Sequence, residues 1–298
     1  MATAFIAVPG RERQHPASMQ LHCGRYRLVL DRPLVMGILN VTPDSFSDGG
    51  RFASLPAALE RGERMAAEGA SIIDVGGEST RPGALPVDVD EELRRVIPVI
   101  ERLAATLGIP VSVDTRKAEV MRVAIQAGAS MVNDVSALGG AGALDSVAGT
   151  YAGVCLMHMQ GEPRTMQQSP DYADVLAEVR AFLRARVARC MAAGIVPARI
   201  AVDPGFGFGK TLPHNLALLR GLPQLAADGV PVLVGLSRKR LIGELTGQPG
   251  GDRLAGSLAL ATLAARNGAR IVRAHDVAAT VAALRIVAAV AADREIAR

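Results

Sequence analysis

Short runs of apolar, strand-forming residues alternate with helical patterns along most of the chain, and this alternation limits the fold more than any other feature. The runs are 34–39, 71–76, 110–114, 129–134, 152–158, 199–203, 230–235 and 269–275. Strands that alternate with helices form parallel βα units, and eight units in about 250 residues is the size of a (β/α)8 barrel. We therefore predict an α/β fold, a single (β/α)8 TIM barrel. A doubly wound open sheet is the alternative.

The segments that flank the runs support this reading. Within 118–129, apolar residues recur at the spacing of one helix face, and Gly128 follows as a typical helix end. Residues 21–33 alternate around Gly24, which predicts an N-terminal β-hairpin that closes the bottom of the barrel. We predict one domain over residues 19–298, preceded by a disordered tail over residues 1–18 that lacks the pattern of a signal peptide.

Composition excludes several classes of partner. Hydrophobic residues make up 49% of the chain and the net charge is +4, with the basic residues spread out. The densest basic cluster, 237–240, is too short for a nucleic-acid surface. No run reaches the ~18 uninterrupted apolar residues of a membrane span. The three cysteines match no metal spacing or disulfide framework. We expect a cytoplasmic protein without a nucleic-acid or membrane partner.

The stretch DPGFGFGKT, residues 203–211, looks like a nucleotide-binding loop but is not one. The Walker pattern would require a glycine at Pro204, and a G-x-G-x-x-G pattern from Gly205 would require one at Lys210. We interpret the stretch as a strand-end carboxylate followed by a glycine-rich turn. Lys210 and Thr211 are expected on the solvent side, at the entry to the next helix.

Polar residues stand at the ends of all eight predicted strands. They are Asn40, Asp74, Asp114, Asn133, Asp134, His158, Asp203, Ser237, Lys239, Arg273 and His275. The carboxyl ends of barrel strands share one rim, which carries the active site. Carboxylates beside an amide suit a flat heterocycle with a row of N–H donors. Asn40, Arg273 and His275 suit phosphate oxygens or a phosphate-bound metal.

Eight blocks of the sequence resemble the signature blocks of the dihydropteroate synthases, which are pterin-binding enzymes. The blocks are 35–50, 74–84, 111–117, 132–137, 156–167, 203–210, 235–239 and 273–277. They occur in order and none is missing, so the resemblance extends from about residue 20 to the C-terminus. It implies a TIM barrel that joins 6-hydroxymethyl-7,8-dihydropterin diphosphate to 4-aminobenzoate. The products are 7,8-dihydropteroate and pyrophosphate, in folate biosynthesis.

The resemblance also implies a role for each matching residue. Those expected to hold the pterin ring are Asp114, Asn133, Asp203 and Lys239, in a slot shaped by Met157, Phe208 and Gly235. Asn40 is expected beside Mg²⁺, while Arg273 and His275 hold the diphosphate. The aminobenzoate site is expected to comprise Phe46, Thr80, Arg81, Pro82 and Ser237. The catalytic residues are expected to be Asp114, Asp203, Lys239 and Arg273.

Further expectations concern loops and partners. The long loops 42–54 and 79–90, the first and second βα loops, are expected to be flexible lids that order with pterin diphosphate and complete the aminobenzoate site. Asp74 and Glu78 are expected to hold the turn after the second strand, and His158 is equally compatible with a structural role. The apolar later helices, notably 279–292, suggest a homodimer. Family members are generally inhibited by sulfonamides, which mimic aminobenzoate.

Two other functions remain compatible with such a barrel. A methyltetrahydrofolate–corrinoid methyltransferase shares the strand-end Asp and Asn residues, but has no use for the anion group Arg273 and His275. A non-catalytic pterin-binding paralogue should have lost residues of the loops or of the anion site. Since Thr80, Arg81 and Lys239 are all present, the sequence favours an active synthase.

Overall fold

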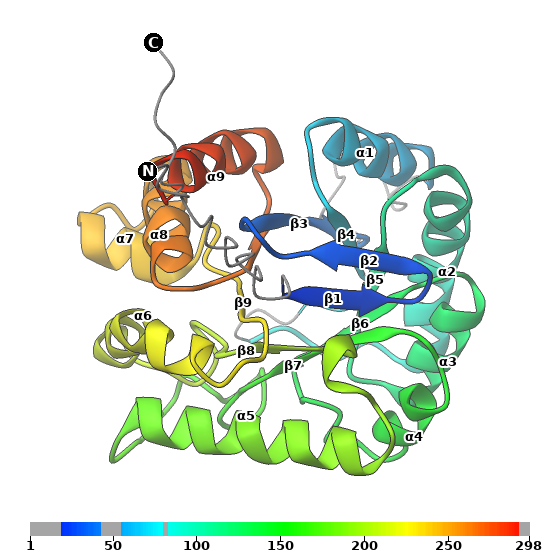
Figure 1. Cartoon of the computed structure of the whole chain (residues 1–298), viewed down its shortest axis with the longest axis horizontal. Coiled ribbons are helices and arrows are strands. Elements are labelled where there is room, and N and C mark those ends of the chain that lie inside the picture. The colour runs from blue at the N-terminus through cyan, green and yellow to red at the C-terminus, as the bar shows by residue number, and fades with distance from the viewer. Residues whose placement is uncertain (1–18, 43–54, 80–82, 292–298) are drawn as a thin grey trace, which may run out of the picture.

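The computed structural model describes residues 19–42, 55–79 and 83–291, which form a barrel of parallel strands inside a ring of helices (Figure 1). The barrel strands are β3 (Leu34–Asn40), β4 (Ile72–Gly76), β5 (Val111–Asp114), β6 (Met131–Asp134), β7 (Gly153–Met157), β8 (Ile200–Asp203), β9 (Leu233–Val234) and β10 (Ile271–Ala274). Their order in the sheet is β8-β7-β6-β5-β4-β3-β10-β9. A parallel bridge between Val202 and Val232 joins β8 to the residue before β9 and closes the barrel.

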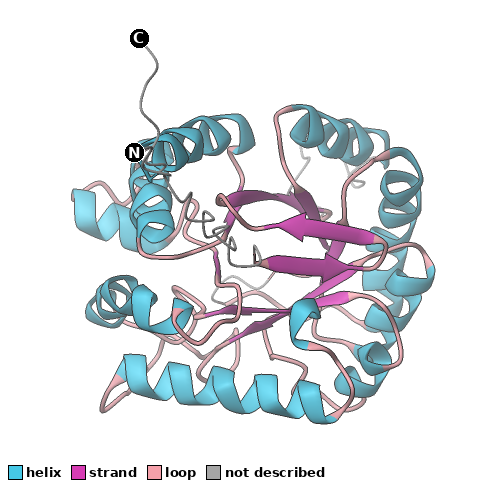
Figure 2. Ribbon diagram, viewed as in Figure 1, coloured by secondary structure: helices cyan, strands magenta, loops and turns pink. Residues whose placement is uncertain are grey.

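Helices follow the strands and cover the outside of the barrel, as Figure 2 shows. They are α1 (Leu55–Ala67), α2 (Val89–Thr106), α3 (Ala118–Gln126), α4 (Ala143–Ala148), α5 (Val175–Ala192), η2 (Pro197–Arg199), α6 (Leu212–Ala226), α7 (Arg240–Thr246), α8 (Leu254–Arg266) and α9 (Val277–Ala291). The chain leaves α3 through Gly128, whose positive φ of 109° suits a glycine after a helix. Among the described residues, no helix is both long and apolar enough to cross a membrane.

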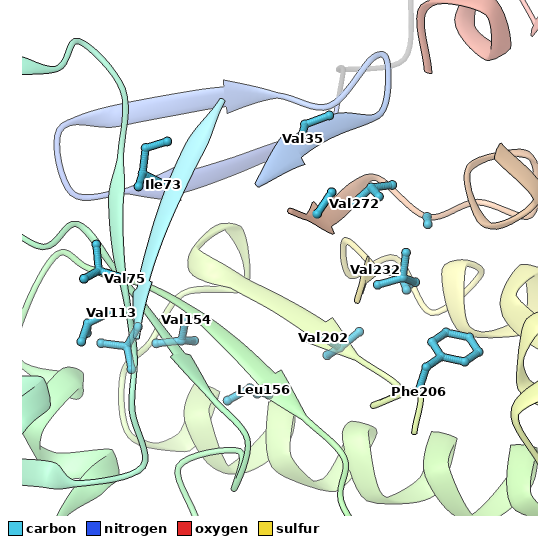
Figure 3. Packing of buried hydrophobic residues seen from close by; sticks show 14 of the residues in the cluster. Val35, Ile73, Val75, Val113, Val154, Leu156, Val202, Phe206, Val232 and Val272 are labelled. Atoms are coloured by element: carbon cyan, nitrogen blue, oxygen red, sulfur yellow. The ribbon is translucent and has the colours of Figure 1, made fainter. Parts of the chain in front are cut away.

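The apolar residues form two separate clusters. The larger one lies between the barrel wall and the helices, where β-branched residues such as Val75, Val113 and Val154 point outward from their strands (Figure 3). The smaller one joins residues of the strands, among them Met36, to residues of the hairpin, among them Leu21. The hairpin pairs β1 (Gln20–Cys23) with β2 (Tyr26–Val29) in antiparallel register, and it packs on the bottom of the barrel.

The predicted barrel and N-terminal hairpin are therefore confirmed, and the open-sheet alternative is wrong. Consecutive strands from β3 to β8 are neighbours in order, whereas a doubly wound sheet reverses direction partway. Residues 1–18, 43–54, 80–82 and 292–298 lie outside the described residues, so the disordered tail, the domain limits and the loop flexibility stay predictions.

Candidate active site

A pocket opens at the carboxyl ends of the barrel strands. It is lined by Ile38, Asp114, Asn133, Val135, Met157, Asp203, Phe206, Phe208, Gly235, Ser237, Lys239, Arg273 and His275. Apart from Ile38, Val135 and Phe206, every lining residue is a site residue predicted from the sequence. The prediction missed Phe206, although it alternates with glycines in the same turn as Phe208. Parallel strands bring these distant residues together because their carboxyl ends share one rim.

Arg273 bridges two carboxylates at the base of the pocket. Its Nε donates to Asp74 Oδ2 at 2.6 Å, and its Nη2 donates to Asp114 Oδ2 at 2.7 Å. Asn133 Nδ2 also donates to Asp74 Oδ2, at 2.9 Å. Burial alone would lower the pKa of Arg273. The carboxylates of Asp74 and Asp114 raise this pKa by more than burial lowers it, so the guanidinium stays charged.

Asp74 corrects a sequence-based expectation. We expected it to hold the turn after its strand, but it is fully buried within β4 and anchors Arg273 and Asn133 instead. A strand-end carboxylate and an N-cap look alike in sequence, and only the register across β4, β5 and β10 shows which one this is. Asp74 is thus a positioning residue of the site.

Three oxygen acceptors of the pocket remain available to a ligand. Asp114 Oδ1, Asn133 Oδ1 and Asp203 Oδ2 accept no hydrogen bond from any residue that the structure describes, while Asp203 Oδ1 accepts one from Gly205 N at 2.7 Å. Burial raises the pKa of Asp114 to about 7, against the opposing effect of Arg273, and burial also raises the pKa of Asp203. The acceptors come from the carboxyl ends of β5, β6 and β8, which share the rim of the barrel.

Lys239 provides a donor in the same pocket. Its Nζ donates to Phe206 O at 2.8 Å and lies 4.0 Å from the ring centre of Phe208, a cation–π contact. Burial lowers the pKa of Lys239 to about 8, so the ammonium form still predominates at neutral pH. An ammonium has three N–H donors, and only one is used here within the described chain.

His275 and Ser237 meet at the side of the pocket. His275 Nδ1 lies 3.0 Å from Ser237 Oγ, which also accepts a hydrogen bond from His275 N at 3.2 Å. Arg61 of α1 donates to the carbonyl of His275 at 2.8 Å and so holds the end of β10. Helix α7 begins after Ser237, at Arg240.

Lys210 is another correction. We expected it on the solvent side, but its side chain is buried, with only 3% exposed, and its Nζ contacts Gly205 O, Phe208 O and His158 Nδ1. The physical reason is that the glycine turn folds back over the lysine, which no local pattern shows. Thr211 does stand at the entry to α6 as its N-cap residue, where its side chain accepts a hydrogen bond from His214 N.

The comparisons with known proteins decide the family. A model of the pterin-binding enzymes matches residues 36–275. The chain is also 51% identical over 277 residues to the dihydropteroate synthase of Escherichia coli (strain K12), which covers 93% of this chain and 98% of that one. This chain belongs to the dihydropteroate synthase family. The expected enzyme class, a transferase, is confirmed with it.

Solved structures of dihydropteroate synthases agree. One from Xanthomonas albilineans with 4-aminobenzoic acid is 56% identical, with a TM-score of 0.87, and covers 93% of this chain and 100% of its own. Another from the same organism, in complex with 7,8-dihydropteroate, is 54% identical with a TM-score of 0.84 and covers 92% and 100%. These likenesses extend over nearly the whole chain, so the pocket belongs to a dihydropteroate synthase fold.

The remaining predicted residues of a dihydropteroate synthase are placed as follows. Asn40 ends β3 and is paired in register with Gly76, close to Asp114 of the next strand, β5. Asn40 Oδ1 and Asp114 Oδ2 would each lie 3.7 Å from a Cβ atom built on Gly76. Phe46, Thr80, Arg81 and Pro82 lie outside the described residues.

This arrangement fits Mg²⁺, although the described residues contain no group of three His, Cys, Asp or Glu side chains that could hold a metal. Mg²⁺ usually takes one or two protein oxygens and completes its shell with water and substrate phosphates. Asn40 Oδ1, at the end of β3, is such an oxygen, and a diphosphate would supply others.

Proposed function

We propose that this protein joins 6-hydroxymethyl-7,8-dihydropterin diphosphate to 4-aminobenzoate, giving 7,8-dihydropteroate and pyrophosphate in folate biosynthesis. The observation that carries the proposal is the set of unused acceptors on Asp114, Asn133 and Asp203 in one pocket with the unused donors of Lys239. A pterin presents N–H groups along one edge and an oxygen and ring nitrogen along the other, which complements this arrangement.

The pterin would be held by hydrogen bonds to charged groups, which are stronger than neutral ones. Asp114 and Asp203 accept from ring N–H groups and stabilise positive charge that grows on the ring as the leaving group departs. Met157, Phe208 and Gly235 shape the slot: Gly235 leaves open space where a Cβ atom would meet nothing. The described pocket thus supplies both recognition and electrostatic stabilisation.

The diphosphate would lie toward Asn40, Arg273 and His275. The charge of Arg273 is already balanced by Asp74 and Asp114, so it acts on the leaving group chiefly by orientation and by its remaining N–H donors. Mg²⁺, when bound beside Asn40, would offset the charge that grows on the leaving oxygens. His275 is kept in place by Ser237, at the edge of the same pocket.

The 4-aminobenzoate would enter last. Its amine is a weak base that is neutral near pH 7, so it attacks the exocyclic methylene carbon of the pterin without a strong general base. Ser237 is the described residue of its site, together with Phe46, Thr80, Arg81 and Pro82. The aminobenzoate complex of the Xanthomonas albilineans relative supports this substrate.

A homodimer and a cytoplasmic location complete the proposal. The later helices carry exposed apolar side chains, among them Leu263 of α8 and Ile286 of α9, which are 52% and 66% exposed. Such a surface favours self-association. All three cysteines are free and buried, which suits a reducing compartment.

A coupled assay of pyrophosphate release tests the function. Purified protein is given dihydropterin diphosphate with and without 4-aminobenzoate and Mg²⁺, beside Asp114→Ala and, as a matched control, the surface variant Asp145→Ala. We expect Mg²⁺-dependent release, dihydropteroate only with aminobenzoate, and loss of both in Asp114→Ala alone. Tight pterin binding without turnover would instead support a non-catalytic paralogue, and methyl transfer from methyltetrahydrofolate would support the methyltransferase.

A further inference from the structure

The turn after β8, residues 205–209, has an unusual set of hydrogen bonds. Each of its five successive carbonyl oxygens accepts a hydrogen bond from a side chain. The donors are Lys210 to Gly205 (3.0 Å) and Phe208 (2.9 Å), Lys239 to Phe206 (2.8 Å), Gln167 to Gly207, and Tyr172 to Gly209 (2.8 Å). Backbone groups in a turn normally bond to water or to one another, so this turn is held from outside.

The conformation of the turn explains why it needs such support. Gly205, Gly207 and Gly209 all have positive φ angles, between 60° and 77°. The turn also packs directly on the segment after β7, because a Cβ atom on Gly205 would lie 1.9 Å from His158 O and one on Gly209 would lie 2.3 Å from Gln160 O. Glycine permits this backbone path but loses more conformational freedom on folding than other residues. The side-chain donors therefore hold a segment that would otherwise be free to move.

Lys210 makes the central contacts. Its buried Nζ lies 3.0 Å from Gly205 O, 2.9 Å from Phe208 O and 3.0 Å from His158 Nδ1. An ammonium group has three N–H donors, which match these three acceptors, while a fourth acceptor, His158 O, lies farther away at 3.4 Å. His158 is itself fixed, because its backbone N donates to Asp203 O at 2.9 Å and its ring packs edge-on against Phe182.

The contacts of Lys210 survive loss of its proton. Burial lowers the pKa of Lys210 to about 7 and that of His158 to about 3, so the imidazole stays neutral. A neutral amine can still donate to the carbonyls of Gly205 and Phe208, and it can accept a hydrogen bond from the Nδ1–H tautomer of His158. Lys210 thus holds the turn in either protonation state.

We propose that Lys210 is a positioning residue of the pterin site. It links Gly205 to Phe208, near the two ends of the turn, and so positions the pocket groups that these residues contact. At one end, Gly205 N holds the carboxylate of Asp203. At the other, the ring of Phe208 makes the cation–π contact with Lys239 Nζ. Lys210 is not among the residues that line the described pocket, so it acts through the groups that it holds. The inference rests on the proposed pterin site.

The test compares Lys210→Met with a matched control at the other end of the same strand. Arg199, just before β8, is also buried and also donates to two backbone carbonyls, those of Ala152 at 2.8 Å and Val147 at 3.3 Å. Arg199→Met therefore removes an equivalent buried cation, but far from the pocket. KM and kcat are measured for each substrate, with calorimetry of dihydropterin diphosphate binding in parallel.

We expect Lys210→Met to lower kcat/KM for dihydropterin diphosphate by roughly 10- to 100-fold, because misplacing site groups by about 1 Å costs on that order. The KM for aminobenzoate should stay unchanged, and amide hydrogen exchange should accelerate in residues 203–210. Arg199→Met should lower the melting temperature and leave pterin binding intact. Equal pterin binding in Lys210→Met and wild type, or equal losses in both variants, would overturn the inference.

Two further measurements keep the test decisive. If Lys210→Met does not fold, Lys210→Gln, which retains an N–H donor, and Tyr172→Phe, which removes only the contact to Gly209, should each weaken pterin binding by several-fold. Unchanged binding in both would refute the role of the turn. Hydrogen exchange needs no turnover, so a failure of the proposed synthase reaction is distinguishable from a failure of this inference.

Discussion

Arg273 Nε and Asp74 Oδ2 lie 2.6 Å apart although 199 residues separate them in the chain. The contact crosses from β10 to β4, on either side of β3, and both side chains point into the barrel. Asp74 also leaves its Oδ1 without a hydrogen-bond partner among the described residues. Orienting the guanidinium at the base of the pocket therefore leaves one oxygen of the Asp74 carboxylate without solvation.

Replacing Asp74 should test that relationship. Asp74→Ala would leave a buried guanidinium with one carboxylate, and breaking a buried ion pair costs about 3–5 kcal/mol of folding free energy. We expect a loss of that order in urea denaturation, together with a strong loss of activity. The control is Arg240→Ala, which removes an exposed ion pair with Glu244 and should cost at most about 1 kcal/mol. Equal midpoints for Asp74→Ala and wild type would contradict the assignment.

The pH dependence of kcat/KM for dihydropterin diphosphate should be bell-shaped, with its maximum between pH 7 and 8. Asp114 must be ionised to accept hydrogen bonds, and its pKa of about 7 makes activity rise with pH through that value. Lys239 must be protonated to donate, and its pKa of about 8 makes activity fall above that value. kcat/KM reports groups of the free enzyme.

Variants assign the two limbs of that profile. Asp114→Asn should be weakly active and lack the acidic limb, and Lys239→Arg should lack the alkaline limb. Asp134, whose pKa burial raises to about 6, is a suitable control because its two oxygens bind Ser136 N and Leu138 N outside the pocket. If Asp134→Asn shifted the acidic limb while Asp114→Asn did not, the assignment would be wrong.

Substrate binding should be ordered. We expect 4-aminobenzoate to bind poorly to the free protein and much more tightly once pyrophosphate or pterin diphosphate is present, because its proposed site includes the loop residues Thr80 and Arg81. Isothermal titration calorimetry measures this directly, with pyrophosphate at saturation in one series and absent in the other. Equal affinity in the two series would exclude the ordered mechanism.

The proposed homodimer has a simple test in sedimentation equilibrium. Wild-type protein should sediment at twice the mass of its 298-residue chain, and the double variant Leu263→Glu/Ile286→Glu should shift toward the monomer. Tyr151→Glu serves as the control, since Tyr151 is 84% exposed on the segment between α4 and β7, away from α8 and α9. A dimer that resists the first change, or no dimer at all, would refute this interface.

The sequence predicts most of the pocket because the strand–helix pattern repeats along the chain and the predicted strand of each repeat ends in a polar residue. Eight parallel strands put their carboxyl ends on one rim, so Asp114, Asn133 and Asp203 are placed together once the strands are recognised. The contacts of Asp74 and Lys210 could not be predicted from this repeating pattern. The contact of Asp74 depends on the register between strands that are far apart in sequence. The contacts of Lys210 depend on how the glycine turn folds back over the lysine that follows it.

The glycine turn beside the pterin pocket also limits how the protein can evolve resistance. A side chain at Gly205 or Gly209 would collide with backbone oxygens at 1.9 and 2.3 Å, and every carbonyl between them is already bound. An inhibitor that contacts the backbone at Gly205 or Gly209 would therefore press on positions where a side chain cannot be added without moving the neighbouring backbone. By contrast, the proposed aminobenzoate site draws on residues of the long loops 42–54 and 79–90, and surface loops generally tolerate sequence change.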